Sequence, residues 1–296
     1  MRKCFSTLLA AVFVATTMGL AAREVSWTSS FFSTNLDSEG SNLSGEWVFY
    51  LGYFEAGFVP SVSNTEQWSE NWATVDLAPY SEASSRFVGF FESGGGDEVN
   101  QQAYIWGLNR QNITNEWILV SNPTWIFPGS GLGFRLNWGI TSNDAIVVVG
   151  EVDQDGIHMR TAQVPGEPPL LTYAQWQKLH FTEAELTQGL VTGTTADADD
   201  DGRANSIEFA LATDPKSGAD FPCLTSSLGD DGRHEVRVQL ARQTVATVNP
   251  QVTGNLASWN SSSSDVTVLS MTPTSMLFRD NTFSTQRFAR VQVVIP

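Results

Sequence analysis

The chain has 296 residues, of which 41% are hydrophobic and 16% charged, and its formal net charge is −16. This apolar fraction excludes an intrinsically disordered chain, and the length suits about two domains. A strongly acidic chain is repelled by nucleic acid and by anionic lipid, so we expect neither as a partner. Composition alone indicates no particular reaction.

The first 22 residues have the pattern of a secretory signal peptide. Met1-Arg2-Lys3 is a short basic start, residues 5–20 are largely apolar, and residues 19–22 supply the small side chains of a cleavage site. We therefore predict a secreted protein, with the extracellular space, the cell surface or the periplasm as its destination. The exported chain would keep one cysteine, Cys223, and so no internal disulfide. Beyond residue 22 no apolar run approaches the ~20 residues of a membrane span, so we expect no integral membrane segment.

Residues 23–163 alternate between strand-like runs and turn residues. Clusters of Gly, Asn and Ser separate the runs, which favours an antiparallel β-sandwich or a barrel-like domain. A hairpin turn is expected at residues 153–156, and a short helix at 65–72 capped by Asn64. The clearest strand-like runs are 46–54, 87–91, 102–108, 116–120, 134–138 and 145–152.

A proline-rich stretch at residues 164–171 predicts an extended linker, because three prolines in five residues do not suit a central strand. The next segment, 172–218, begins with two helix signals: Thr172 with Gln175, and Thr182 with Glu185, each form a capping-box pair. From residue 222 to 296 the pattern returns to alternating strands. This length and pattern predict a C-terminal β-sandwich of fibronectin-like size.

One segment carries a specific chemical pattern. Residues 197–208 place Asp at loop positions 1, 3 and 5, Gly at 6, Asn at 9 and Glu at 12, which is the spacing of a calcium-binding EF-hand loop. Ca²⁺ prefers about seven oxygen ligands, whereas Mg²⁺ gives up its water reluctantly and demands a stricter octahedron. An acidic, solvated turn is the alternative interpretation. We predict a Ca²⁺ site whose ligands are Asp197, Asp199, Asp201, the backbone carbonyl of Arg203, Asn205 and Glu208, with the Arg203 side chain facing solvent.

This loop and residues 209–215 resemble the EF-hand-like calcium segments of dockerins and thrombospondin type 3 repeats. They are most similar to a version found in mostly uncharacterised families of exported bacterial proteins, in which a helical stretch precedes the loop and a β domain follows it. The resemblance implies that the same six residues bind Ca²⁺. It also has limits: the second loop with which dockerins bind cohesin is missing, and residues 189–195, with two glycines, make a poor helix before the loop. We therefore expect a structural clip and not a regulatory hand.

The N-terminal aromatics suggest a weaker possibility. Eight of the ten tryptophans lie between Trp27 and Trp138, and core packing is the favoured explanation for them. The alternative is a glycan-binding face, for which Trp125 and Phe127 are the best candidates for exposure.

Signals of catalysis are fewer still. Glu92 and residues 97–98 could supply a carboxylate pair for glycoside hydrolysis, although their separation does not follow from sequence. Ser130 lacks the strand–turn–helix setting of a nucleophile elbow. The three histidines, His158, His180 and His234, have no metal-ligand spacing.

Together these features predict a mainly β, secreted, non-catalytic binding or scaffold protein in which Ca²⁺ stiffens the junction at residues 172–218. Its partner would be a protein or a glycan. The alternatives are a glycan-binding module that uses the N-terminal aromatics and a secreted hydrolase.

Overall fold

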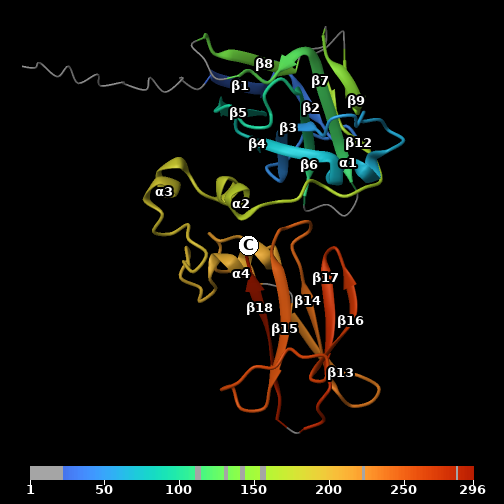
Figure 1. The fold of residues 1–296 in the computed structure, drawn as a ribbon, viewed down its shortest axis with the longest axis vertical. Coiled ribbons are helices and arrows are strands. Elements are labelled where there is room, and N and C mark those ends of the chain that lie inside the picture. The colour runs from blue at the N-terminus through green and yellow to red at the C-terminus, as the bar shows by residue number, and fades with distance from the viewer. Residues whose placement is uncertain are drawn as a thin grey trace, which may run out of the picture.

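The structure is a computed structural model that describes residues 23–110, 115–129, 133–140, 144–153, 158–221, 224–284 and 286–296. The fold is mainly β, as predicted. An N-terminal β lobe lies at one end of the molecule and a smaller C-terminal β lobe at the other, and three helices lie between them (Figure 1). The predicted signal peptide, Cys223 and residues 154–156 of the predicted turn fall outside the described residues. No helix within the described ranges has the length and apolar character needed to cross a membrane.

The N-terminal lobe is built on a large sheet with the order β12-β7-β6-β3-β4-β5-β1-β8, and β9 pairs with β7. Antiparallel pairing dominates, as expected, but β1 and β8 run parallel. A small sheet, β10-β11-β2, includes the predicted hairpin. The strands are β1 (Arg23–Ser29), β2 (Thr34–Leu36), β3 (Trp47–Phe54), β4 (Trp72–Ser81), β5 (Arg86–Ser93), β6 (Gln102–Asn109), β7 (Glu116–Ile126), β8 (Leu136–Ile140), β9 (Ile146–Val149), β10 (Glu151–Val152), β11 (His158–Arg160) and β12 (Ala162–Gln163).

The central strand β3 is buried on both faces of this sheet. Phe49 and Leu51 point into a cluster inside the curl of the sheet, whereas Val48 and Tyr50 point into a second cluster on its outer face. A solvated face would require polar side chains at alternate positions, and β3 has none. The aromatic-rich run thus marks a strand covered on both sides, and the outer cover comes partly from the helical segment.

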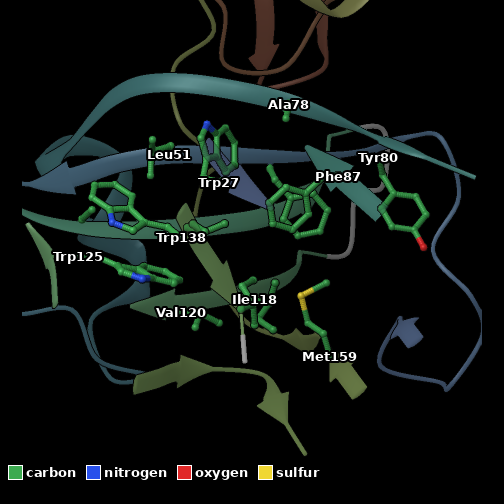
Figure 2. Packing of buried hydrophobic residues seen from close by; sticks show 14 of the residues in the cluster. Trp27, Leu51, Ala78, Tyr80, Phe87, Ile118, Val120, Trp125, Trp138 and Met159 are labelled. Atoms are coloured by element: carbon green, nitrogen blue, oxygen red, sulfur yellow. The ribbon is translucent and has the colours of Figure 1, made fainter. Parts of the chain in front are cut away.

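The tryptophans serve the core. Trp125 and Phe127, the best candidates for an exposed glycan-binding face, are 4% and 0% exposed, so the favoured explanation, core packing, applies to both. Trp125 stacks on Trp138 with ring centroids 6.0 Å apart, deep in the inner cluster (Figure 2). The reason is that β7 continues to Ile126 and turns Trp125 inward. None of the ten tryptophans is exposed, so none of them forms an exposed glycan-binding face.

The helical signals are largely confirmed. The capping boxes at Thr172 and Thr182 are both formed, and they start α2 (Tyr173–His180) and α3 (Glu183–Gln188). The short helix at 65–72 is present as η1 (Thr65–Gln67) and α1 (Trp68–Asn71), but Asn64 does not cap it. Instead, the Asn64 carboxamide accepts a hydrogen bond from the Trp68 indole at 2.9 Å and so helps to position a buried ring.

The C-terminal lobe has two sheets that pack face to face. One is four-stranded, with the order β13-β14-β17-β16, and the other consists of β15 and β18 alone. The predicted sandwich is therefore present as six strands divided four and two, and a fibronectin-like domain is not seen. The strands are β13 (Leu224–Leu228), β14 (His234–Gln239), β15 (Thr247–Thr253), β16 (Val266–Thr272), β17 (Ser275–Asp280) and β18 (Phe288–Val294), preceded by helix α4 (Asn205–Leu211).

Candidate metal site

In the acidic segment 197–208, residues 197–204 form a tight loop and residues 205–208 are the first turn of α4. Both oxygens of Asp197 accept backbone hydrogen bonds from across the turn, from Asp201 N–H at 3.1 Å and from Gly202 N–H at 2.7 Å. Gly202, the glycine at loop position 6, has φ +90°, a conformation that residues with a Cβ adopt only under strain, so glycine suits this sharp turn. The first aspartate thus closes the loop.

Three carboxylates converge on the inside of this loop. One oxygen from each of Asp197, Asp199 and Asp201 can be chosen so that all three lie within 4.8 Å of one another. One oxygen of Asp199, Oδ2, is buried and has no hydrogen-bond partner among the described residues. Like charges held this close repel one another, so the arrangement favours a bound cation.

Glu208, at loop position 12, provides a more specific observation. Its side chain is 0% exposed, and both of its carboxylate oxygens lack a hydrogen-bond partner within the described chain. Burial, together with the nearby negative charges of Asp199 and Asp201, raises the pKa of Glu208 to about 7. A buried carboxylate without a partner is energetically costly. Since both oxygens are free to bind, Glu208 has what a bidentate calcium ligand requires.

Asn205 is placed beside the loop by hydrogen bonds that hold the preceding turn. Its side-chain amide donates to the carbonyls of Val191 and Gly193 at 2.8 and 3.0 Å. The side chain is fully buried, and its Oδ1 has no partner in the described structure. Its oxygen therefore remains available to a water molecule or an ion, as predicted for position 9.

The Arg203 side chain differs from its prediction. It does not face solvent: its guanidinium contacts the carboxylate of Asp201, donates to the carbonyl of Asp220 at 2.6 Å and lies 4.6 Å above the Phe221 ring. The reason is electrostatic, since a cationic side chain beside a cluster of carboxylates is attracted to them. Arg203 therefore occupies part of the coordination space of Asp201.

Helix α2, and not a helix directly before the loop, supports the loop, a role that no local sequence signal marks. The Tyr173 hydroxyl and the Gln177 amide both donate to the carbonyl of Thr192, at 3.0 and 2.6 Å. Desolvation raises the pKa of Tyr173 to about 12, so the hydroxyl stays protonated and donates. The expectation of a poor helix at 189–195 is confirmed, because α3 ends at Gly189 in a left-handed conformation and turns follow.

Helix α4 joins the hydrophobic cores of the two lobes immediately after Glu208. Phe209 packs in the outer cluster of the N-terminal lobe, where Tyr173 and Trp176 of α2 contact its ring edge-on. The next two residues, Ala210 and Leu211, pack in the core of the C-terminal lobe. Successive residues of one helical turn therefore pack in the cores of different lobes. A displacement of Glu208 would move residues in both cores.

Two arginines also connect the lobes: Arg110 lies in the N-terminal lobe and Arg242 in the C-terminal lobe, and each forms hydrogen bonds with the opposite lobe. Arg110 donates to the backbone carbonyls of Arg242 and Gln243 at 2.7 and 3.0 Å. Arg242 in turn donates to Asn115 at 2.8 Å and forms an ion pair with Glu167 of the proline-rich stretch. That stretch is thus held against both lobes.

The histidines do not form a second group of metal-ligating side chains among the described residues. His180 lies 3.6 Å from Asp214 at the junction, whereas His234 lies in the C-terminal lobe beside Ser226. The side chain of His158 and the residue Ser130 lie outside what the structure describes. The loop at 197–208 is consequently the place where the described residues bring several metal-ligating groups together. No family model, curated protein or solved structure matches the chain.

Proposed function

We propose that residues 197–208 bind one Ca²⁺ ion and that the ion fixes the orientation of α4 between the two lobes. Asp197, Asp199, Asp201 and Glu208 would supply carboxylate oxygens, Arg203 a backbone carbonyl, and Asn205 a direct or water-mediated contact. The protein would act as a secreted, non-catalytic binding or scaffold protein stiffened by calcium, with a protein or a glycan as its partner.

The observation that carries this proposal is the state of Glu208. Acidic turns are common on protein surfaces, and Asp197, Asp199 and Asp201 are only half-buried. Glu208 is different, because a solvated turn has no need of a fully buried carboxylate with two unpartnered oxygens. A divalent cation would offset the burial of this charge and the repulsion among the four carboxylates.

The position of the loop supports a structural role. Glu208 is followed at once by Phe209, which packs with the N-terminal lobe, and by Ala210 and Leu211, which pack with the C-terminal lobe. Extracellular calcium modules bind with Kd values of about 10⁻⁴ to 10⁻³ M, which corresponds to ~0.4 to 1.4 kcal/mol at 1 mM free Ca²⁺. This is enough to order one helical turn and far too little to fold the lobes.

Isothermal titration with CaCl₂ tests the metal assignment directly. The wild-type protein should bind one Ca²⁺ per chain, and Glu208→Ala should remove binding. Asp200→Asn is the matched control: Asp200 lies in the same loop, is exposed, and has φ +60°, which asparagine tolerates. Absence of heat in the wild type, or equal binding by the Glu208 variant, would contradict the proposal.

A further inference from the structure

A cavity of about 550 Å³ lies at the junction of the two lobes. Its walls come from parts of the chain that are far apart in sequence: strands β3 and β4 of the N-terminal lobe, helix α2 between the lobes, and the residues that follow α4 and β14 (Figure 1). Sites for small molecules commonly have this size and lie between domains. Walls on several sides suit a whole small molecule better than an extended chain. None of the proposed calcium ligands lines this cavity.

Part of the cavity wall is apolar and still accessible. Leu179 of α2 and Leu240 and Ala241 of the C-terminal lobe line the cavity and are only half-buried. A ligand with an apolar body would remove this surface from water, which favours binding.

The aromatic ring in the wall is not open for stacking. Trp176 lines the cavity but is 4% exposed, because the rings of Tyr173 and His180 lie against it with centroid distances of 5.2 and 4.9 Å. A saccharide that stacks on an aromatic ring needs a free face of that ring. The cavity therefore favours an aliphatic or aromatic ligand body over a sugar.

Three exposed carboxylates also line the cavity, and each has an oxygen to spare. One oxygen of Glu46 accepts from Asn109 at 3.2 Å, one of Asp214 accepts from the Lys216 N–H at 3.0 Å, and one of Asp220 accepts from the Asp214 N–H at 3.0 Å. The second oxygen of each carboxylate accepts no hydrogen bond from the described residues. The polar part of the wall thus offers negatively charged acceptors.

The cationic groups of the wall are already engaged. The guanidinium of Arg110 donates to four oxygen acceptors, and that of Arg242 forms an ion pair with Glu167. Burial lowers the pKa of His180, so its imidazole is neutral at pH 7 and leaves the charge of Asp214, 3.6 Å away, uncompensated. Together with the net charge of −16, this favours a cationic ligand over an anion.

Thr213 provides a separate observation beside these carboxylates. It precedes Asp214, lines the cavity and is 5% exposed, and its hydroxyl has no hydrogen-bond partner among the described residues. A buried hydroxyl without a partner is energetically costly. Its oxygen can accept a hydrogen bond from an N–H of a ligand.

We propose that this cavity binds a small molecule that carries a protonated amine on an apolar body. The ammonium group would lie against Asp214, Asp220 and Thr213, and the apolar body against Leu179 and Leu240. An ammonium group has three N–H donors and no acceptor, which matches a wall of free acceptors. Charge complementarity identifies the occupant, because an anion would be repelled and a neutral alcohol would supply a single donor. This inference does not rest on the proposed calcium site.

Titration calorimetry with three matched probes tests the ligand class, in EDTA and physiological salt so that calcium plays no part. The probes are 4-phenylbutylamine, 4-phenylbutanol and 4-phenylbutyrate, which share an apolar body and differ in charge. The amine should bind with a Kd of about 1 mM or lower and at least about tenfold more tightly than the alcohol, and the carboxylate should not bind. Absence of binding by the amine, or equal binding by the alcohol, would overturn the proposal.

The double variant Asp214→Asn, Asp220→Asn tests the place of the ammonium. Asparagine keeps an oxygen for the backbone N–H groups that these carboxylates accept from, so the fold should be retained. The affinity for 4-phenylbutylamine should fall about tenfold. Asp230→Asn, which removes an exposed charge from the turn between β13 and β14, is the control and should bind as the wild type does. Unchanged binding by the double variant would refute the site.

Thr213→Val separates a binding role from a structural one. It replaces an unpartnered hydroxyl with a methyl group of the same size, so it should weaken binding of the amine several-fold without lowering the melting temperature. Binding equal to that of the wild type would refute the placement of the ammonium beside Thr213. Nα-acetyl-lysine amide and glucose complete the set of probes. Tighter binding of either than of 4-phenylbutylamine would overturn the choice of a small apolar amine.

Discussion

Replacing Glu208 by glutamine should stabilise the calcium-free protein at pH 8 and abolish its stabilisation by calcium. The substitution keeps the size of the side chain but removes its negative charge. Without calcium, the wild-type carboxylate is buried with neither oxygen hydrogen-bonded among the described residues, and its pKa is raised to about 7 from the usual 4.5. A raised pKa in the folded state stabilises the fold below about pH 4.5, and this contribution is lost as the pH rises through 7.

The size of the effect follows from these values. One pK unit corresponds to about 1.4 kcal/mol, so ionised Glu208 destabilises the calcium-free fold by at most ~3 kcal/mol at pH 8. Glu208→Gln should relieve most of this penalty at pH 8 and change little at pH 4. Calcium narrows this difference: at 10 mM Ca²⁺ the wild type should gain about 1.4 to 2.7 kcal/mol for Kd values of 10⁻³ to 10⁻⁴ M, and the variant should gain almost nothing.

Thermal unfolding at pH 4, 6 and 8, in EDTA and in 10 mM CaCl₂, measures these effects for both proteins. For a chain of this length the calcium shift in the wild type should be a few degrees. Asp200→Asn removes the same charge from an exposed position of the loop and should behave as the wild type does. If Glu208→Gln is less stable than the wild type in EDTA at pH 8, or if calcium stabilises it equally, the assignment of Glu208 as a ligand is wrong.

Four further outcomes follow from the geometry of the junction. Arg203→Gln should tighten calcium binding several-fold in titration calorimetry, because it frees the carboxylate of Asp201. Protons compete for Glu208, so titrations of the wild type should give an affinity about tenfold lower at pH 6 than at pH 8. Phe209→Ala should lower the free energy of unfolding in urea by about 3 to 5 kcal/mol, since the ring is 1% exposed. Arg242→Ala should increase the maximum dimension in small-angle scattering, whereas the exposed Arg237→Ala should not.

The features predicted correctly from sequence are those that depend on neighbours along the chain. The capping boxes at Thr172 and Thr182 depend on residues three positions apart, and both are present. The turn at Gly202 likewise needs only the local loop geometry. The burial of Glu208 could not be predicted in this way, because it depends on the packing of the adjoining helices.

Trp125 shows how a local signal can mislead. Asn122 and Pro123 before it are residue types typical of a loop, because proline cannot donate to a sheet ladder. In the structure, β6 and β7 shift register between Gln102 and Tyr104, and Pro123 is exposed with no strand partner at this irregularity. The strand therefore continues past the proline and buries Trp125. A bulge is set by the neighbouring strand, so the sequence of β7 alone could not indicate it.

The contacts between the lobes were unpredictable for a different reason. Arg110 and the carbonyl of Arg242 are 132 positions apart, and nothing near either residue marks the other as a partner. The order of the strands in the large sheet, including the parallel pair β1 and β8, is similarly a property of the whole fold. Sequence pattern identified most of the elements and the candidate ligands, but not their arrangement.

These contacts define what calcium can contribute. The lobes are already joined by the Phe209 ring, by Leu211 and by the hydrogen bonds of Arg110 and Arg242, none of which needs a metal. Among the described residues, the groups left without a hydrogen-bond partner at this site include both oxygens of the buried Glu208 carboxylate, in the first turn of the shared helix, and one oxygen each of Asp199 and Asn205. An ion that binds there removes a penalty at the point where the two cores meet, so a free energy of about 1 kcal/mol acts on both lobes through a single helical turn. Calcium would then hold α4 in the orientation to which the apolar contacts and the two arginines already restrict it.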